Sequence, residues 1–548
     1  MVPNFLVNAF LEVLKSVFSL DFENRLRFEQ PRNEEFGDFA TSIALILAKE
    51  LKRNPREIAE SIVQNLKLDS NLVEKISIDG PGFINIKLSK NFFALELDQM
   101  FKVGEDFGKG NKGLGQKVNV EYVSANPTGL LHLGHGRNAC IGDSIANLYQ
   151  WLGYDVTREY YFNNAGRQMQ NLARSIFARY RQILGDNDYP FPEDGYHGDY
   201  IKEIANEIAE KFGKTYYEEI PENIEFCKTY GEKWCFEKIR STLEKLNIHH
   251  DVFFNEDSLY KDGKIEDVIN ILREKGLVYD KDGAIWLALS KLGLSEDRVI
   301  VKSTGEPTYR LPDIAYHREK FLRNFDLIVD VLGSDHIATV PDVLAGLKAL
   351  GFDTSKVKVV FHQFVTLTEN GVQVKMSKRS GRSYTLDELI DEVGADVVRF
   401  FFVMRSVSSH LEFDLNLARE QSEKNPVFYL QYAHARICSI FDTAKERGIE
   451  FNPKVTTECI SKPEEINLIK LQRRFPEVVE VSAEKFEPQI LADYLYDVAT
   501  AFHTFYHECR IIGSEEPILS ARFKLAKVTQ RILRNGLKIL GVSAPTRM

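Results

Sequence analysis

The segment from Val118 to Arg137, VNVEYVSANPTGLLHLGHGR, constrains the fold more than any other part of the chain. It opens with a β-branched apolar run, which the Asn-Pro-Thr-Gly sequence at 126–129 ends because it continues neither a strand nor a helix. After the HLGH sequence at 132–135, apolar residues recur at helical spacing. A strand, a tight loop and a helix N-terminus form the place where an α/β sheet binds nucleotide. We therefore predict a doubly wound, Rossmann-like α/β domain with a nucleotide site here.

Two histidines stand at the predicted helix N-terminus. His132 and His135 place imidazole nitrogens there, and Gly134 between them leaves room for a flat base against the backbone. A pair of histidines with this spacing is usually a surface feature without a function. Its position after an apolar strand and before a helix favours nucleotide binding instead.

The sequence around these residues resembles that of a known family. ANPTGLLHLGH is similar to the nucleotide-binding signature of the class I aminoacyl-tRNA synthetases, and of the arginyl-tRNA synthetases in particular. A second signature, KMSKR at 375–379, follows in the order that the family shows. The resemblance covers essentially the whole chain. It implies an arginine–tRNA ligase, which activates L-arginine with ATP to arginyl-adenylate and transfers it to the 3′ end of tRNA.

The chain divides into four predicted parts. Residues 1–110 indicate an α+β unit, and 116–375 a Rossmann-like catalytic domain with an insertion. Residues 376–420 hold the KMSK loop and a stem-contact region, and 421–548 indicate an all-α helical bundle. By the resemblance, the first part contacts the outer corner of the tRNA and the last binds the anticodon. Within these parts we predict one strand at 357–367 and one helix at 466–480.

Composition narrows the class of protein. A net charge of −10 over 548 residues argues against a general nucleic-acid coat protein, but leaves a tRNA partner open. No apolar segment reaches bilayer-spanning length, and the N-terminal apolar segment carries Glu12 and Lys15, as an amphipathic helix does and a signal peptide does not. Six scattered cysteines without a C-x-x-C pair predict a reducing environment without disulfides or structural zinc. We expect a cytoplasmic, monomeric enzyme with no membrane partner.

The resemblance assigns roles around ATP, which would enter as its Mg²⁺ complex without a metal ligand from the protein. His132 and His135 would contact the phosphates, and Lys375 and Lys378 would neutralise the departing pyrophosphate. Lysine suits that task as a flexible point charge. The 333–336 segment, at the end of a predicted core strand, would face adenosine or substrate. The implied ATP-binding residues are His132, Gly134, His135, Gly333, Asp335, His336, Met376, Ser377 and Lys378.

A second pocket must bind arginine. Because a guanidinium stays charged at every working pH, a pocket that buries it must supply carboxylates. By the resemblance, Glu121, Tyr309 and Asp313 hold the guanidinium, and Asn126 holds the α-amino or carboxylate end. The spacing of Tyr309 and Asp313 puts them on one side of a helix. Asp313 is also a candidate cap for the helix that follows it, and Glu256 is a weaker candidate for the same pocket.

The C-terminal segment predicts a tRNA-binding face. Lys524, Lys527, Arg531 and Arg534 advance by three or four residues, and no acidic residue occurs from Ser520 to the end. Such a face favours phosphate contact, and a merely solvated face is the alternative. Four aromatic residues are candidates for stacking on unpaired bases or for core packing: Tyr429, Tyr432, Phe502 and Phe505.

Three other functions remain as alternatives. A small-substrate nucleotidylyltransferase with the same HxGH signature would need neither the N-terminal unit nor the helical bundle. A catalytically inactive tRNA-binding relative would tend to lose His132, His135 or Lys378, and all three are present. A class I synthetase for another amino acid, such as cysteine, fits poorly with the Tyr309 and Asp313 pair, which favours a cationic side chain.

Overall fold

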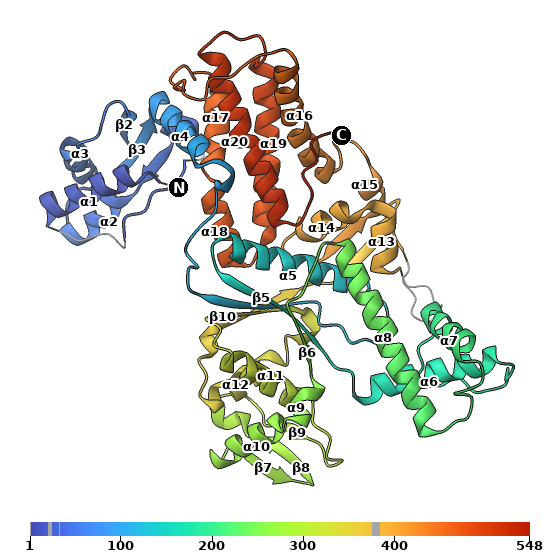
Figure 1. The fold of residues 1–548 in the computed structure, drawn as a ribbon. Coiled ribbons are helices and arrows are strands. Elements are labelled where there is room, and N and C mark those ends of the chain that lie inside the picture. Colours follow the sequence, from blue (N-terminus) through green and yellow to red (C-terminus); the bar gives the residue numbers. More distant parts are fainter. Residues whose placement is uncertain (1, 20–24, 32, 375–383) are drawn as a thin grey trace.

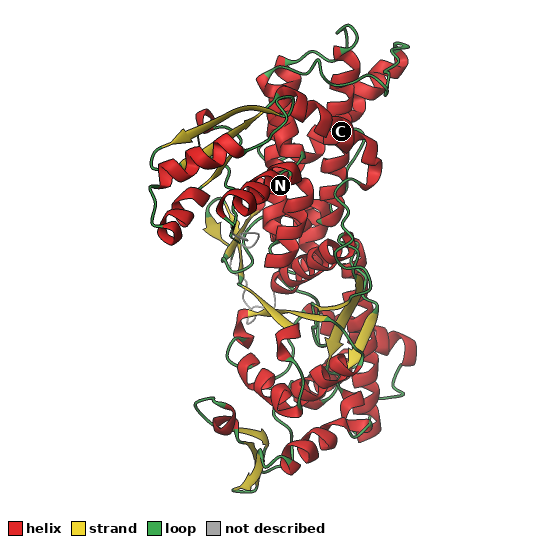
Figure 2. Cartoon of the chain, turned by 90° about the vertical axis from the view of Figure 1, so that its left-hand side faces the viewer, coloured by secondary structure: helices red, strands yellow, loops and turns green. Residues whose placement is uncertain are grey.

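The computed structural model describes residues 2–19, 25–31, 33–374 and 384–548. Figure 1 shows a central parallel sheet, a helical domain above it with the N-terminal unit at its side, and two groups of elements below. The view in Figure 2 shows the same stacking along the long axis of the molecule. The α/β catalytic domain, the N-terminal α+β unit and the C-terminal helical bundle confirm the predicted fold class.

The N-terminal unit packs helices on a small antiparallel sheet with strand order β1-β3-β2. The FGDFA and GPGFINIKL sequences form the first strand and the hairpin that closes the sheet. α4 leaves this unit and runs along the helical domain (Figure 1). The elements are α1 (Asn4–Phe18), β1 (Phe39–Thr41), α2 (Ile43–Leu51), α3 (Pro55–Asn65), β2 (Val73–Asp79), β3 (Phe83–Leu88) and α4 (Lys90–Val103), with the 3₁₀ turns η1 (Glu34–Phe36) and η2 (Gly104–Asp106).

Five parallel strands form the central sheet in the order β11-β10-β4-β5-β6. The chain starts at β4, adds β5 and β6 on one side, and later adds β10 and β11 on the other. The switch point therefore lies between β4 and β10, where such sheets bind ligands outside the carboxyl ends of their strands. The strands are β4 (Lys117–Glu121), β5 (Asp155–Phe162), β6 (Val252–Asn255), β10 (Leu327–Gly333) and β11 (Val357–His362).

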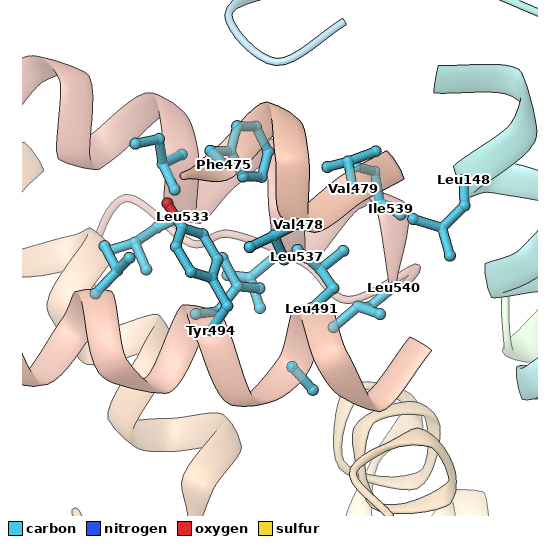
Figure 3. Close-up of a cluster of buried hydrophobic side chains, with 14 of the residues drawn as sticks. Leu148, Phe475, Val478, Val479, Leu491, Tyr494, Leu533, Leu537, Ile539 and Leu540 are labelled. Carbon is cyan, nitrogen blue, oxygen red and sulfur yellow. The ribbon is translucent and has the colours of Figure 1, made fainter. Parts of the chain in front are cut away.

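Helix α5 (Leu133–Trp151) begins within the HLGH signature and is buried along nearly its whole length. One side covers the sheet, where Gly142 lies so close to Tyr122 that a Cβ would collide with that ring. The other side meets the helical domain, and Figure 3 shows Leu148 beside the side chains of that domain. Because both sides are buried, the position of His132 and His135 is fixed by the cores of two domains.

Two insertions extend from the sheet. Between β5 and β6, α6 (Gly166–Ile183), α7 (Asp199–Phe212) and α8 (Pro221–Lys245) form a unit with its own apolar core. Between β6 and β10, three helices surround a short hairpin sheet whose Asp282-Gly283 turn has positive φ at both residues. These elements are α9 (Asp257–Lys261), α10 (Lys264–Glu274), β7 (Val278–Lys281), β8 (Ala284–Leu287), η3 (Leu289–Leu292), β9 (Arg298–Val301) and α11 (Arg310–Leu322). After β10 come η4 (Ser334–His336), α12 (Val340–Leu350) and η5 (Thr354–Lys356).

The strand that we predicted at 357–367 is two strands. β11 ends at His362, and β12 (Val365–Glu369) joins a separate sheet with order β13-β12-β14. The break falls at Gln363. Its carbonyl accepts a hydrogen bond from the buried Arg137 guanidinium and therefore does not pair with a neighbouring strand. This stem region consists of β12, β13 (Val372–Gln373), α13 (Leu386–Val393), α14 (Ala395–Val403), β14 (Leu411–Asp414) and α15 (Leu415–Arg419).

The helical domain packs its helices around α20 (Ile518–Ile539). The helix that we predicted at 466–480 is two helices, α17 (Pro463–Gln472) and α18 (Phe475–Lys485). Pro476 explains the break, because it has no N–H to donate to the Gln472 carbonyl four residues before it, whereas the first turn of α18 tolerates a proline. The other helices are α16 (Pro426–Glu446) and α19 (Pro488–Glu508).

Candidate active site

The N-terminus of α5 is built by the two signature histidines. His132 caps the helix, and its Nδ1 accepts hydrogen bonds from the backbone N–H groups of Gly134 and His135 at 3.1 and 3.4 Å. His135 Nδ1 accepts in return from the His132 N–H at 3.3 Å. The two rings stack with their centroids 3.6 Å apart. Side chains therefore satisfy the first N–H groups of the helix and fix both rings in place.

This arrangement also sets the tautomer of both rings. Because each Nδ1 accepts a hydrogen bond from an N–H group, the proton of the neutral ring must sit on Nε2. Each ring thus has its N–H donor at the end remote from the backbone. Two such donors at a helix N-terminus are suited to the oxygens of a phosphate chain.

The described segment that follows the second signature lies at the same helix N-terminus. Lys375, Met376, Ser377 and Lys378 lie outside the described residues. Just beyond them, Thr385 pairs as an isolated bridge with His132, and the Leu386 N–H donates to the Leu131 carbonyl at 2.9 Å. The chain segments that follow the second signature and open the first are thus neighbours.

The predicted adenosine-facing residues lie at the carboxyl end of β10. Gly333 is the last residue of that strand, and Asp335 and His336 occupy the exposed turn η4. Behind them, the Asn138 amide donates to the Val331 carbonyl at 2.8 Å, and its oxygen accepts from the Val123 N–H at 2.6 Å. Asn138 therefore ties α5 to the ends of two neighbouring strands across the switch point.

Three carboxylates lie side by side below the site, and we call them the carboxylate row. Strand pairing places Asp330 opposite Glu121 and Glu121 opposite Glu159, and all three are buried. Three cationic or protonatable residues of α11 and its C-cap, spaced three apart, face them, and we call these the cation ladder: His317, Lys320 and Arg323.

The two sets pair closely. Lys320 Nζ donates to Glu121 Oε2 at 2.5 Å and to Asp330 Oδ1 at 2.6 Å. The Arg323 guanidinium donates two hydrogen bonds, one to each oxygen of the Glu159 carboxylate, at 2.7 and 2.8 Å. Glu121, which the resemblance assigns to the arginine pocket, therefore already has a cationic partner, and its second oxygen accepts from the Ser124 hydroxyl at 2.9 Å.

Asp313 differs from the carboxylate row. It lies one helical turn before His317 on α11, and within the described parts of the chain no donor or cation reaches its carboxylate. Burial raises the pKa of Asp313 to about 7, the nearby Glu121, Glu256 and Asp330 carboxylates add to the rise, and the His317 ring opposes it. Asp313 is thus a largely buried acid without the hydrogen-bonded cation that its neighbours have in the described structure.

Glu256 is a second acid without a cation in the described structure. It is buried, and its carboxylate accepts from the Tyr161 hydroxyl, from the Asn163 amide at 2.7 Å and from the Tyr260 hydroxyl at 3.3 Å. Burial raises its pKa. The Asn163 backbone N–H in turn donates to the Asn126 side chain at 2.9 Å. Asn163 therefore links Asn126 to Glu256.

The structure adds residues that the sequence interpretation did not include. The donors on Glu256 come from the end of β5 and from α9, and His317 and Lys320 come from α11. The only sequence signal was position, because His317 follows Asp313 by one helical turn and Asn163 follows an apolar strand. Tyr309, at the N-cap of α11, is 81% exposed, and its side chain makes no hydrogen bond to any described residue.

The predicted tRNA-binding face of α20 needs correction. Lys524 and Arg531 are buried, and Lys527 and Arg534 are partly buried, because α4 and η2 pack on this side of α20. Our premise that no acidic residue compensates the face is wrong, since the acids come from the N-terminal unit far away in sequence. The face is an interface within the chain, not an open surface.

We call this contact the α4–α20 interface. Lys524 Nζ donates to Asp98 Oδ1 at 2.7 Å, and Arg531 Nε donates to Glu105 Oε1 at 2.9 Å. Arg534 also pairs with Glu105, and these two guanidinium groups hold the pKa of Glu105 below its ordinary value despite partial burial. Burial lowers the pKa of Lys527, which donates to Gln530 at 2.7 Å.

The aromatic candidates divide into two kinds. Phe502 and Phe505 are fully buried in the helical core. Tyr429 and Tyr432 are partly exposed on α16, where the Arg436 guanidinium lies 4.8 Å from the Tyr432 ring centroid and 5.1 Å from that of Tyr506 on α19. Core packing therefore explains the phenylalanines, while the tyrosines border a face of arginine and aromatic rings.

No helix among the described residues is long and apolar enough to cross a bilayer. No group of three or more His, Cys, Asp or Glu side chains among them is arranged to hold a metal ion.

Comparison with known families matches each part of the chain. The model "tRNA synthetases class I (R), catalytic domain" matches residues 100–400, "Arginyl tRNA synthetase N terminal domain" matches 4–88, and "DALR anticodon binding domain" matches 430–548. The fold and the paired signatures thus define a class I aminoacyl-tRNA synthetase.

Relatives that match over nearly the full length show which class I aminoacyl-tRNA synthetases this chain is most like. The chain is 50% identical to the arginine–tRNA ligase of Desulfotalea psychrophila over 95% of its own length and 94% of that protein, and 47% identical to that of Salinibacter ruber over 96% of each. A putative arginyl-tRNA synthetase from Campylobacter jejuni superposes with a TM-score of 0.77 at 33% identity, covering 84% of this chain and 100% of that one. The Thermus thermophilus enzyme shares the fold, with a TM-score of 0.78 at 22% identity over the full length of both. The chain belongs to the arginyl-tRNA synthetases, the arginine–tRNA ligases.

Proposed function

We propose that the arginine pocket of this ligase is the space bordered by Asp313, Glu256 and Asn126 at the carboxyl edge of the sheet. The observation that carries the proposal is that two buried carboxylates, Asp313 and Glu256, lack a cationic partner within the described residues. Burying an acid without a counter-charge is costly, so such a pair is retained where a ligand supplies the cation. A guanidinium is a ligand of that kind.

The proposed binding mode divides the pocket between the two ends of arginine. Asp313 neutralises the guanidinium, and Glu121 lines the pocket floor with a charge that Lys320 already balances. Tyr309, exposed at the N-cap of α11, covers the planar group. Asn126 binds the α-amino or carboxylate end of arginine. Glu256 contributes to arginine binding from its position beside Asn163.

The reaction then needs positioning and electrostatic stabilisation, and no enzyme nucleophile. A carboxylate oxygen of arginine attacks the α-phosphorus of Mg²⁺–ATP, the new O–P bond forms, and the bond to pyrophosphate breaks. The Nε2–H groups of His132 and His135 donate to phosphate oxygens as charge builds up on them. The terminal ribose hydroxyl of tRNA next attacks the arginyl carbonyl, and AMP leaves. Gly134, Gly333, Asp335 and His336 border the adenosine in this proposal.

The second signature stays a proposal from sequence. Lys375 and Lys378, with Met376 and Ser377 between them, would neutralise pyrophosphate as it leaves. The described residue Thr385, which follows this segment, pairs with His132, and the short distance along the chain from Thr385 to the second signature supports that role.

For tRNA, we propose the face of α16 and α19 around Arg436, Tyr432 and Tyr506 in place of the α20 face. Arginine and aromatic rings together suit unpaired bases, which stack on both groups. The face lies in the domain that the anticodon-binding model matches.

We also propose a cytoplasmic enzyme that acts as a monomer. The six cysteines are free thiols, and the proposed pocket uses residues of one chain only. Light scattering at working concentration checks the monomer, and a mass of twice the 62.8 kDa chain would overturn it.

One assay tests the proposed function. ATP–pyrophosphate exchange is measured with each of the twenty amino acids, with and without tRNA. Of the twenty amino acids, we expect only arginine to support exchange. A chain that exchanges equally without any amino acid would instead be a nucleotidylyltransferase. Exchange with a different amino acid would keep the class and reject the arginine pocket.

A further inference from the structure

The cation ladder and the carboxylate row match one to one. Asp330, Glu121 and Glu159 lie on three adjacent strands, and each receives a hydrogen bond from α11 or its C-cap. Lys320 and Arg323 are permanent cations at neutral pH. The charges of the two sets therefore cancel only if the third member of the cation ladder, His317, is also positively charged.

The hydrogen bonds of His317 decide its charge. Its Nδ1 lies 2.8 Å from the Asp313 backbone carbonyl, and its Nε2 lies 2.8 Å from Asp330 Oδ2. A carbonyl only accepts, so Nδ1 must carry a proton. The Asp330 carboxylate also accepts from Lys320, so it is ionised, and Nε2 must carry a proton as well. The ring is thus held as an imidazolium.

The charges around His317 agree with this assignment. Burial works against a charged ring, but the Asp330 carboxylate outweighs it and raises the pKa of His317 above its ordinary value. Asp330 itself is held ionised, with a pKa below its ordinary range, by Lys320 and His317 against the effect of burial. The groups that face the ring are Asp330 on β10, Glu121 on β4, and Asp313 and Lys320 on α11.

We propose that His317 is a positioning residue of the arginine site, whose imidazolium completes the charge balance beneath the pocket and so leaves Asp313 ionised for the guanidinium. The inference rests on the proposed arginine pocket. Without the His317 charge, the row holds one negative charge in excess directly below Asp313. A proton then competes with arginine for that carboxylate over a wider pH range.

The test replaces the charge and keeps much of the shape. We compare arginine affinity of the full-length enzyme, measured by calorimetry from pH 6 to pH 9, for wild type, His317→Gln and the control His197→Gln, which alters an exposed histidine of the insertion. In His317→Gln we expect the pH midpoint of arginine binding to rise by about one unit or more, as for loss of a nearby opposite charge. Affinity should fall about tenfold at pH 6.5 and recover toward the wild-type value at pH 9.

A parallel loss at every pH would mean a packing role only and would overturn the inference, as would an unchanged profile. A charge-retaining His317→Lys variant should keep its midpoint close to wild type. If His317→Gln does not fold, the ionisation of the histidine is followed directly by nuclear magnetic resonance in the wild-type enzyme. A neutral His317 ring at pH 7 would then reject the proposal.

A separate variant distinguishes this inference from the proposed pocket. Asp313→Asn should lose arginine binding at every pH. If Asp313→Asn binds arginine normally, the pocket itself is misplaced. If it does not bind but the His317→Gln profile is parallel to wild type, only the role of His317 is rejected.

Discussion

The proposed arginine pocket and the α4–α20 interface use the same kinds of charged residue in opposite ways. At the interface, Lys524 and Arg531 each pair with a carboxylate from another domain. In the pocket, Asp313 and Glu256 are buried without a cation among the described residues. A charge whose partner is built into the chain holds the structure together. A charge whose partner is missing is available to a ligand.

The two regions should therefore respond differently to mutation. Removing one member of a buried pair leaves the other unpaired, which lowers stability. Removing an acid that has no partner relieves its desolvation cost and leaves stability intact. Mutations in the pocket are thus expected to reduce arginine binding without lowering stability, and mutations at the interface to lower stability without reducing arginine binding.

The largest expected effect is at the pocket. Asp313→Asn removes the charge opposite the guanidinium, and loss of one partner of such a pair typically costs about 3–5 kcal/mol, so arginine affinity should fall more than about 100-fold. ATP affinity should stay unchanged. Because the folded-state pKa of Asp313 lies above its ordinary 3.8, the carboxylate costs stability at pH 8, and the variant should melt no lower than wild type there. Calorimetry of both ligands and thermal unfolding check this.

A drop in melting temperature at pH 8 together with normal arginine affinity would reverse the assignment, because it would make Asp313 a structural residue.

The interface gives the next largest effect. Lys524 has a buried side chain, so Lys524→Met leaves Asp98 without its cation and should lower the free energy of unfolding by about 2 kcal/mol. Arginine and ATP affinities should not change. The matched control is Lys538→Met on the same helix, which is exposed and has no ion pair in the described structure, and it should leave stability unchanged.

Denaturant unfolding measures this difference. If Lys524→Met kept full stability but reduced the salt dependence of tRNA binding, Lys524 would be a phosphate contact, and our first interpretation of the α20 face would be restored.

The pH dependence of arginine binding is a smaller effect that sharpens the contrast. A carboxylate with a pKa of about 7 must lose its proton to pair with the guanidinium, so affinity rises with pH through 7 and levels off above it. At pH 6 we expect arginine to bind about tenfold more weakly than at pH 8. Calorimetry at pH 7 in two buffers of different ionisation enthalpy should show release of about half a proton. Binding that is constant between pH 6 and pH 8 would mean that Asp313 is ionised throughout.

The smallest effect belongs to the exposed edge of the interface. The Arg534 side chain is 41% exposed, and its pair with Glu105 is largely screened by solvent. Arg534→Ala should therefore change the free energy of unfolding by less than about 1 kcal/mol. A loss of stability as large as that of Lys524→Met would show that solvent exposure does not determine how much these ion pairs stabilise the fold.

Local pattern was sufficient to predict the fold and the first signature. The apolar run before the HLGH sequence became β4, and the helical spacing after it became α5. Both elements depend on residues within a few positions of one another, where spacing along the chain determines the geometry. The roles of Glu121 and Asp313 came instead from the family resemblance, and no local spacing supplies them.

The rest depends on contacts that no local pattern contains. Asp98 and Glu105 reach α20 across more than 400 positions, so the run of lysine and arginine on that helix carried no sign of its partners. The carboxylate row forms only when β10, β4 and β5 pair in one register. The same register brings Glu121 within reach of Lys320, whereas no cation among the described residues is hydrogen-bonded to the Asp313 carboxylate.

The most direct test of that difference uses L-citrulline, the uncharged analogue of arginine with nearly the same shape. The ratio of arginine affinity to citrulline affinity is measured for wild type and for Asp313→Asn at pH 8. If the unpaired Asp313 charge selects the guanidinium, wild type should prefer arginine by more than about 100-fold, and the preference should nearly vanish in Asp313→Asn. An equal preference in both enzymes would contradict the account, because the selecting charge would then lie elsewhere.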